Sequence, residues 1–251
     1  MTCIRLENNF DEQASLYARY RPKYPKRLFS FLASIAPDTK VAWDCGTGNG
    51  QAALALTSYF QKVLATDISE NQIKNAFKNK KINYWVSRCK DTNIVDGSID
   101  LITVAQALHW FEINAFYREA QRALKPGGII AVWCYHLSEI EPEIDRIITK
   151  YYYEVVGKYW HPVMKLVRDH YRSIPFPFNE ISHPEFSIEV YWEFTNIIGF
   201  LKSWSATIMY IKEQKRDPIE LIKNELANSW AKPEYRRLVR FPLYLKIGKK
   251  N

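Results

Sequence analysis

Short apolar runs alternate with segments of helical spacing through the first half of the chain. The apolar runs are rich in β-branched and aromatic residues, which favours strands, whereas the segments between them repeat apolar positions at helical intervals. The predicted strands cover residues 40–44, 63–67, 82–86, 100–105 and 129–134, and the predicted helices cover residues 51–60, 70–79 and 112–124. This alternation indicates an α/β fold, with a parallel sheet, right-handed crossovers and helices on both faces.

The second half of the chain is less regular. Helical spacing predicts three helices, over residues 141–156, 196–209 and 218–230. Prolines and aromatic residues without a clear period predict an irregular cap over residues 161–184. Alternating apolar residues predict two late strands, over 186–194 and 238–247. Because the sequence contains no repeat and no low-complexity linker, we expect one domain over residues 1–251.

A glycine loop follows the first predicted strand, with Gly46, Gly48 and Gly50 directly after it. Glycine lets a chain turn sharply and lets a ligand lie against bare backbone. The next strand ends on a lone acid, Asp67, which is placed to accept hydrogen bonds from ribose hydroxyls. A glycine loop alone is weak evidence, since many strand-to-helix turns contain glycine. The loop and the acid together predict a nucleoside-cofactor site.

The spacing of the glycines distinguishes between cofactors. A dinucleotide fingerprint reads G-x-G-x-x-G, but here the third glycine comes one residue early and position 51 is Gln. Asp44, at the end of the strand, would repel a phosphate and attract an ammonium group. The expected ligand therefore has a ribose and a positive charge, and no pyrophosphate.

The string from Asp44 to Gly50 resembles the D-x-G-x-G-x-G motif of class I S-adenosylmethionine-dependent methyltransferases, and all four motif positions match. The resemblance implies a Rossmann-like, seven-stranded, mostly parallel sheet with an antiparallel last strand. It also implies S-adenosylmethionine as the cofactor. The expected organisation is an N-terminal lid over residues 1–30, a cofactor-binding core over 31–137, and cap insertions with the last two strands over 138–251.

The resemblance also implies which residues contact the cofactor. Asp67 corresponds to the acid on the ribose hydroxyls and Ile68 to the residue packed on adenine, while Ser69 can equally serve as a helix N-cap. The segment from Ser87 to Asp91 departs from the family pattern at Cys89 and Lys90. The full implied set is Tyr20, Arg21, Asp44, Gly46, Thr47, Gly48, Asp67, Ile68, Gln72, Lys90, Asp91, Ala105 and Gln106.

Other strings resemble the small-molecule branch of this family near trans-aconitate methyltransferases and their fungal relatives. They are Ala105–Phe111 (A-x-A-x-H-W), Leu124–Gly128, Tyr17–Pro25 (Y-x-x-x-R-P-x-Y-P) and Ser203–Ser205. The resemblance implies that Tyr20 and Arg21 close over the methionine end of the cofactor. It implies a catalytic or positioning role for His109, with a substrate site lined by His109, Trp110, Trp160 and Trp204. A structural histidine is the alternative for His109.

Composition limits the partners. The net charge of +8 raises the possibility of RNA binding, but the basic residues are spread over the chain and the densest group, residues 74–81, fits a solvated helix. The four cysteines lack metal or disulfide spacing, so we expect reduced thiols and no metal. No apolar stretch approaches the length of a membrane span. We expect a cytoplasmic monomer with no nucleic-acid or membrane partner.

The sequence thus predicts methyl transfer to a small molecule, at a carboxylate or hydroxyl oxygen. A carboxylate acceptor is already ionised, so His109 would position it, whereas a hydroxyl acceptor would give His109 its proton. Two alternatives remain open. The first is an RNA or protein methyltransferase, and the second is a protein that binds S-adenosylmethionine without catalysis.

Overall fold

A computed structural model describes residues 20–251, and these residues form two compact units. The sheet unit comprises residues 23–135, 165–187 and 243–251. The helical unit comprises described residues 20–22 together with 136–164 and 188–242. The chain therefore passes between the two units several times. Among residues 20–251, no helix has both the length and the apolar character needed to cross a membrane.

The described residues form a mixed, mostly parallel sheet in the strand order β3-β2-β1-β4-β5-β8-β6, with β7 paired to β8. The pairs among β1 to β5 are parallel, and β8 runs antiparallel to β5 and to β6. This arrangement confirms the predicted fold class. The strands are β1 (Val41–Cys45), β2 (Lys62–Asp67), β3 (Ile82–Val86), β4 (Ile99–Ala105), β5 (Leu124–Cys134), β6 (Asn179–Glu180), β7 (Phe186–Trp192) and β8 (Arg237–Lys249).

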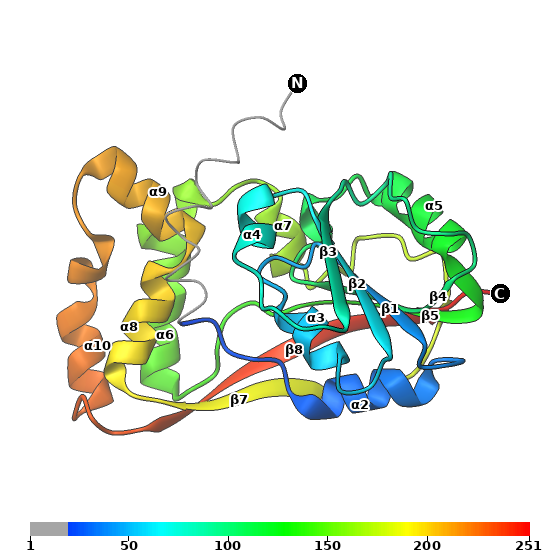
Figure 1. The fold of residues 1–251 in the computed structure, drawn as a ribbon. Helices are drawn as coiled ribbons and strands as arrows, with labels where there is room; N and C mark the ends of the chain where they lie inside the picture. The colour runs from blue at the N-terminus through cyan, green and yellow to red at the C-terminus, as the bar shows by residue number, and fades with distance from the viewer. Residues whose placement is uncertain (1–19) are drawn as a thin grey trace. The chain divides into compact units, whose positions relative to one another are not determined.

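Helices cover both faces of the sheet unit (Figure 1). Side chains alternate between the two faces of a strand. Trp43 of β1 points toward α5, where its ring centroid lies 6.3 Å from that of Phe116, and Trp133 of β5 points toward α2, 6.2 Å from Phe29. The sheet is therefore the middle of three layers. The helices are α2 (Lys26–Ile35), α3 (Gln51–Leu56), α4 (Glu70–Lys74), α5 (Ile113–Ala123), the 3-10 turn η2 (Leu108–Trp110) and α7 (Met164–Arg168), which starts at a unit boundary.

Two helices of the sheet unit end earlier than predicted, and local hydrogen bonds explain why. The helix expected over residues 51–60 ends at Leu56, where the Lys81 ammonium donates to the Thr57 carbonyl at 2.7 Å and satisfies the open helix end. The helix expected over residues 70–79 ends at Lys74, because the Asn75 side chain donates to the Asn71 carbonyl at 2.9 Å.

The fifth strand starts earlier than predicted. Leu124 already pairs with Ile99, and the register shifts between Ile99 and Leu101. Gly127 and Gly128 precede the predicted strand over residues 129–134, but they lie inside the observed strand, and Gly127 takes a φ of +74°. An irregularity of this kind lets a strand absorb an extra residue without ending.

The helical unit packs α6 against α10 and α8 against α9 (Figure 1). Its centre is aromatic: the Tyr151 hydroxyl is 2.8 Å from the Thr207 hydroxyl, and the rings of Tyr151 and Trp204 are 5.9 Å apart. The elements are α6 (Pro142–Lys150), the π-turn η3 (Tyr151–Val155), η4 (Gly157–Tyr159), α8 (Phe194–Lys202), α9 (Ser205–Gln214), η5 (Pro218–Leu221) and α10 (Lys223–Trp230).

Each long helix predicted for this unit is divided in the structure. The segment 196–209 breaks at Ser203, whose hydroxyl donates to the Phe200 carbonyl at 2.6 Å, and Trp204 takes an extended conformation. The segment 218–230 consists of η5 and α10, and the segment 141–156 changes from α-helix to π-turn at Tyr151.

Candidate functional site

The glycine loop lies at the carboxyl end of β1 and is tied to β2. The amides of Gly46 and Thr47 both donate to the Thr66 carbonyl, at 2.8 and 3.0 Å. A Cβ at Gly46 would lie 2.6 Å from Ala107, so the loop packs against the segment that leads into η2. At Gly48, among the described residues, the only atom within 4 Å of such a Cβ would be the Gln72 side-chain oxygen, at 3.9 Å. The loop is therefore packed at Gly46 and open at Gly48, where a ligand can approach the backbone.

Asp44 is a buried carboxylate under the glycine loop. One of its oxygens accepts from the Thr47 hydroxyl at 2.5 Å and the other from the Thr103 hydroxyl at 2.7 Å. Burial raises the pKa of Asp44 to about 6, against the effect of these two hydroxyls. Since the side chain is 1% exposed, its negative charge acts on a bound ligand through space. Thr103 did not stand out in the sequence, although it is the strand neighbour of Asp44 in the register of β1 and β4.

Asp67 joins the end of β2 to the glycine loop. Its carboxylate accepts from the Gly48 amide at 2.8 Å and from the Ser69 amide at 2.9 Å. Partial burial raises the pKa of Asp67, and these amides oppose that shift. Ser69 is also the N-cap of α4, where its hydroxyl accepts from the Gln72 amide at 3.3 Å.

Apolar side chains are exposed beside Asp67. The side chain of Ile68 is 50% exposed and that of Val86 is 49% exposed. Val86 is the register partner of Asp67 on β3. Sequence reasoning selected Ile68 but missed Val86, which pairing the ends of the two strands would have revealed. Two exposed apolar residues at one strand edge suit a flat apolar ligand such as a purine ring.

The segment after β3 holds an ion pair. The Lys90 ammonium lies 2.6 Å from a Glu112 carboxylate oxygen, and Lys90 lowers the pKa of Glu112. Asp91 is exposed, and its carbonyl accepts from the Ser87 hydroxyl at 3.2 Å. Lys90, one of the two positions where this segment departs from the family pattern, is thus engaged with the residue that precedes α5.

Gln106 follows Ala105, the last residue of β4, and has a φ of +54°. Its side-chain nitrogen donates to the Tyr135 carbonyl at 3.0 Å, whereas its side-chain oxygen is buried without a hydrogen-bond partner among the described residues. A left-handed conformation in a residue other than glycine is costly and persists where the surroundings impose it. The geometry leaves one buried acceptor at the carboxyl end of the sheet.

His109 and Trp110 lie in η2, directly after this strand end. His109 is 7% exposed and Trp110 is 38% exposed, and their ring centroids are 5.1 Å apart. The Nδ1 atom of His109 is 2.8 Å from the hydroxyl of Tyr171, a residue that sequence reasoning did not select. The structure therefore brings His109 to the same segment that packs on Gly46, through Ala107 and Phe111.

Four predicted site residues belong to the helical unit. The Tyr20 ring lies against Gly199, and the Arg21 guanidinium lies 5.2 Å from the centre of the Phe200 ring. Tyr17, also part of the predicted lid, lies outside the described residues. The expected closure of Tyr20 and Arg21 over the cofactor stays a prediction.

Trp160 and Trp204 both contact Tyr152 within the helical unit. Trp160 stacks on the Tyr152 ring at 4.6 Å and donates from its indole nitrogen to the Tyr152 carbonyl at 3.2 Å. Trp204 is buried, with its ring 5.5 Å from that of Tyr152. Both indoles therefore have packing roles inside this unit, and their contact with a substrate stays a prediction.

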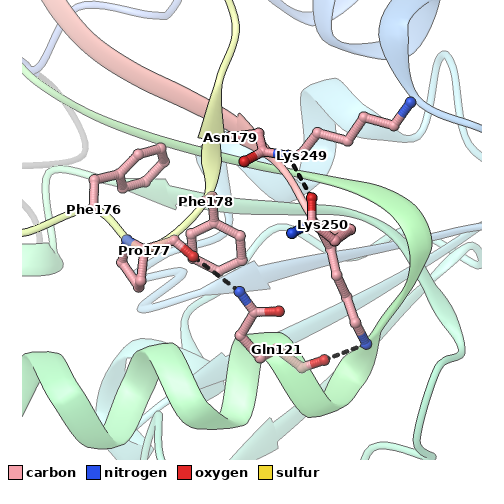
Figure 2. A pocket seen from close by; sticks show the side chains of 8 residues that line it. Gln121, Phe176, Pro177, Phe178, Asn179, Lys249 and Lys250 are labelled. Atoms are coloured by element: carbon pink, nitrogen blue, oxygen red, sulfur yellow. Dashed lines mark hydrogen bonds between the residues drawn. The ribbon is translucent and has the colours of Figure 1, made fainter.

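A pocket of about 230 Å³ lies elsewhere in the sheet unit, near the start of β5 (Figure 2). Phe176 and Phe178 line it together with Lys249 and Lys250. Because the glycine loop follows the carboxyl end of β1, and β5 is parallel to the strands beside it, this pocket lies at the opposite end of those strands. It contains none of the predicted site residues. In residues 20–251, no group of three or more acids, histidines or cysteines could hold a metal ion.

Comparison with known proteins agrees with this geometry. A family model described as a methyltransferase domain matches residues 43–132. A Dictyostelium discoideum protein that carries a methyltransferase name is 33% identical over 256 residues, covering 99% of this chain and 97% of that protein. The chain belongs to the class I S-adenosylmethionine-dependent methyltransferase family.

Two further relatives support the assignment of this methyltransferase. A solved structure of a type II methyltransferase from Anaeromyxobacter dehalogenans superposes with a TM-score of 0.87 at 35% identity, covering 92% of this chain and 98% of that one. The Saccharomyces cerevisiae methyltransferase CRG1 is 24% identical over 88% of each chain. The family assignment makes S-adenosylmethionine the cofactor.

The residues of this methyltransferase fit that cofactor. Asp67 has accepted two amide hydrogens, and since a carboxylate offers roughly four acceptor positions, it has capacity left for ribose hydroxyls. The buried side-chain oxygen of Gln106 suits an ammonium group. Gly48 leaves room for a ligand against the backbone, and Ile68 and Val86 expose apolar surface of the kind that suits adenine.

Proposed function

We propose that this methyltransferase acts on a small molecule, at a carboxylate or hydroxyl oxygen. The observation that carries the proposal is the placement of His109, a buried polar side chain in η2 at the carboxyl end of β4, beside the half-exposed ring of Trp110. One hydrogen-bonding group next to an aromatic ring is typical of a site for a small, partly apolar ligand. The strings shared with the trans-aconitate branch support the same class of acceptor.

The proposal gives each side chain of the site a role that its geometry supports. Asp67 holds the ribose, Ile68 packs on adenine, and Gln106 and the charge of Asp44 hold the ammonium end of the cofactor. Thr47 and Gln72 support the loop and the start of α4, and Lys90 and Asp91 border the adenine side. When bound, S-adenosylmethionine supplies a methyl group on a positively charged sulfur, which an acceptor atom can displace. The protein mainly aligns the two reactants, and alignment can contribute roughly 7–11 kcal/mol.

The direct test of cofactor choice is calorimetric titration with S-adenosylmethionine, S-adenosylhomocysteine, NAD and ATP. We expect binding of the first two only, because the loop lacks the dinucleotide spacing and Asp44 repels phosphate. Tight binding of NAD without binding of S-adenosylmethionine would refute the cofactor assignment.

The test of the acceptor class is methyl transfer from labelled S-adenosylmethionine to panels of small carboxylic acids, small alcohols and phenols, bulk RNA and protein. We expect label in a small-molecule panel. Incorporation into RNA or protein alone would instead support the second class of methyltransferase, and cofactor binding without transfer to any panel would support a protein that binds without catalysis.

Replacing His109 by Ala should lower turnover more than it lowers affinity for S-adenosylmethionine, because His109 belongs to η2, which follows the proposed cofactor residues at the end of β4. A positioning role predicts a loss of about tenfold, and a general-base role predicts about 10²-fold or more. His183→Ala is the matched control, since among the described residues the side chain of His183 hydrogen-bonds only to the carbonyl of Pro184, the next residue in the chain. Equal kinetics for both variants would make His109 a structural residue.

A further inference from the structure

Tyr171 and His109 form a buried hydrogen bond between two segments that are far apart in the sequence. The hydroxyl of Tyr171 lies 2.8 Å from Nδ1 of His109, and the two side chains are 1% and 7% exposed. His109 belongs to η2, and Tyr171 follows α7. Both residues belong to the sheet unit, so their geometry is set within one compact body.

The backbone at Tyr171 is held in an unusual conformation. His170 and Tyr171 both have positive φ, +56° and +60°, and the Tyr171 amide donates to the Leu166 carbonyl at 2.9 Å. The His170 ring stacks flat on Tyr244 of β8. Two successive left-handed residues other than glycine cost of order 1–3 kcal/mol each and persist only where surrounding contacts fix them. The backbone is therefore strained at Tyr171, the residue whose hydroxyl contacts His109.

Tyr171 is the donor and His109 the acceptor in this hydrogen bond. Burial holds the pKa of Tyr171 well above its usual range, so the hydroxyl keeps its hydrogen. A buried hydroxyl hydrogen needs an acceptor, and among the described residues the hydrogen-bond partner of this hydroxyl is Nδ1 of His109. A neutral imidazole that accepts at Nδ1 carries its hydrogen on Nε2.

We propose that Tyr171 is a positioning residue that fixes His109 as the Nε2–H tautomer, so that His109 donates a hydrogen bond to the methyl acceptor instead of taking a proton from it. The inference rests on the proposed function and narrows it, because it selects an acceptor oxygen that is already an anion, as in a carboxylate. That oxygen supplies the electron pair of the new carbon–oxygen bond. The carbon–sulfur bond breaks with its pair left on sulfur, and no proton moves.

The tautomer can be read directly by long-range proton–nitrogen NMR on protein carrying nitrogen-15 histidine. The His109→Ala variant assigns the signal among the five histidines of the chain. We expect wild type to show Nδ1 without a hydrogen and Nε2 with one. Finding the hydrogen on Nδ1 would overturn the proposal.

Tyr171→Phe removes only the hydroxyl, and Tyr117→Phe is the matched control. Tyr117 is a buried residue of α5 whose hydroxyl has no hydrogen-bond partner among the described residues. The first variant should give a mixture of both His109 tautomers and lower kcat by about tenfold, with affinity for S-adenosylmethionine unchanged. The control should leave the His109 signals and kcat as in wild type.

The outcomes separate this inference from the proposed function. If His109 remains entirely in the Nε2–H form in Tyr171→Phe, then Tyr171 does not determine the tautomer and the inference fails. This holds even if methyl transfer to a small molecule has been shown. If the tautomer responds as expected but His109→Ala leaves turnover unchanged, the proposed function of His109 fails and the structural coupling stands. A rise in kcat above the wild-type value in Tyr171→Phe would also contradict a positioning role.

Discussion

Among single residues, Asp44 is a carboxylate that the fold holds at a cost. Its pKa in the folded protein, about 6, lies above the ordinary value of 3.8, so the folded state binds the proton more tightly than the unfolded state. The contribution of Asp44 to the free energy of unfolding is therefore most favourable below about pH 4, and it falls as the pH rises from about 4 to 6. The loss at pH 7 is about 3 kcal/mol. A cationic ligand next to the loop would recover part of it.

Asp44→Asn should therefore raise the free energy of unfolding at pH 7 by up to about 3 kcal/mol relative to wild type, while weakening the binding of S-adenosylmethionine. The stability difference should shrink as the pH falls through 6 and close near pH 4. Urea unfolding of both proteins at four pH values measures it. A difference that does not depend on pH would show that the Asp44 charge is not the cause.

Asp67 has a structural role in the loop and a proposed role in binding the cofactor ribose. Because its carboxylate accepts from the amides of Gly48 and Ser69, Asp67→Ala should destabilise the loop as well as remove the ribose partner. We expect the binding free energy of S-adenosylmethionine to weaken by about 1.5–3 kcal/mol, which is the contribution of a hydrogen bond to a charged group. Ser69→Ala, which removes only the helix N-cap, is the control in calorimetry and thermal unfolding. A variant of Asp67 that binds as tightly as this control would leave the acid a purely structural role.

At the scale of elements, the glycine loop separates binding from stability. Gly48 and Gly50 both have positive φ, but a Cβ at Gly50 would lie 2.1 Å from the Tyr84 hydroxyl, whereas the space at Gly48 is open. Gly50→Ala should lower the free energy of unfolding by roughly 2–5 kcal/mol, and Gly48→Ala by only about 1–2 kcal/mol with a larger loss of cofactor affinity. Urea unfolding and calorimetry of both variants test this. Tyr84→Phe should partly rescue Gly50→Ala, and its failure to do so would exclude the steric explanation.

The elements also show how far the sequence alone can predict this fold. The strand over residues 82–86 has the same bounds in the structure, because a short apolar, aromatic run between polar segments decides a short strand. The break at Ser203 was not predictable, because helical spacing continues on both sides of it. What ends the helix is tertiary: the extended Trp204 packs its ring against Tyr151, Tyr152 and Phe200.

The candidate site divides in the same way. Gly46, Gly48 and Asp67 were predictable, since a loop and an acid at strand ends have a local signature. Val86 and Thr103 could have been found by pairing the ends of neighbouring strands. Tyr171 could not, because residues 161–184 have no period and its left-handed backbone depends on contacts with other parts of the sheet unit.

At the scale of the whole molecule, the predicted site residues are divided between two units. The glycine loop and His109 belong to the sheet unit, and Arg21 belongs to the helical unit. Arg21→Ala should weaken binding of S-adenosylmethionine by about 1.5–3 kcal/mol if the guanidinium binds the cofactor carboxylate. Arg27→Ala is the control, because Arg27 also lies over a ring, that of Phe186, but outside the shared strings. A lowered melting temperature with unchanged affinity would assign Arg21 to packing on Phe200.

The order of the strands affects how the protein is made. β5 lies between β4 and β8, and β8 is the last strand in the sequence. During synthesis, the edge of β5 from Ile129 to Cys134 gains its β8 partners only as residues 244–249 leave the ribosome. An apolar strand edge whose backbone amides and carbonyls are unpaired can pair with other strands. Nascent chains on neighbouring ribosomes expose the same β5 edge. Pauses in translation between the codons for Cys134 and Lys249 therefore expose this methyltransferase to aggregation with its own copies.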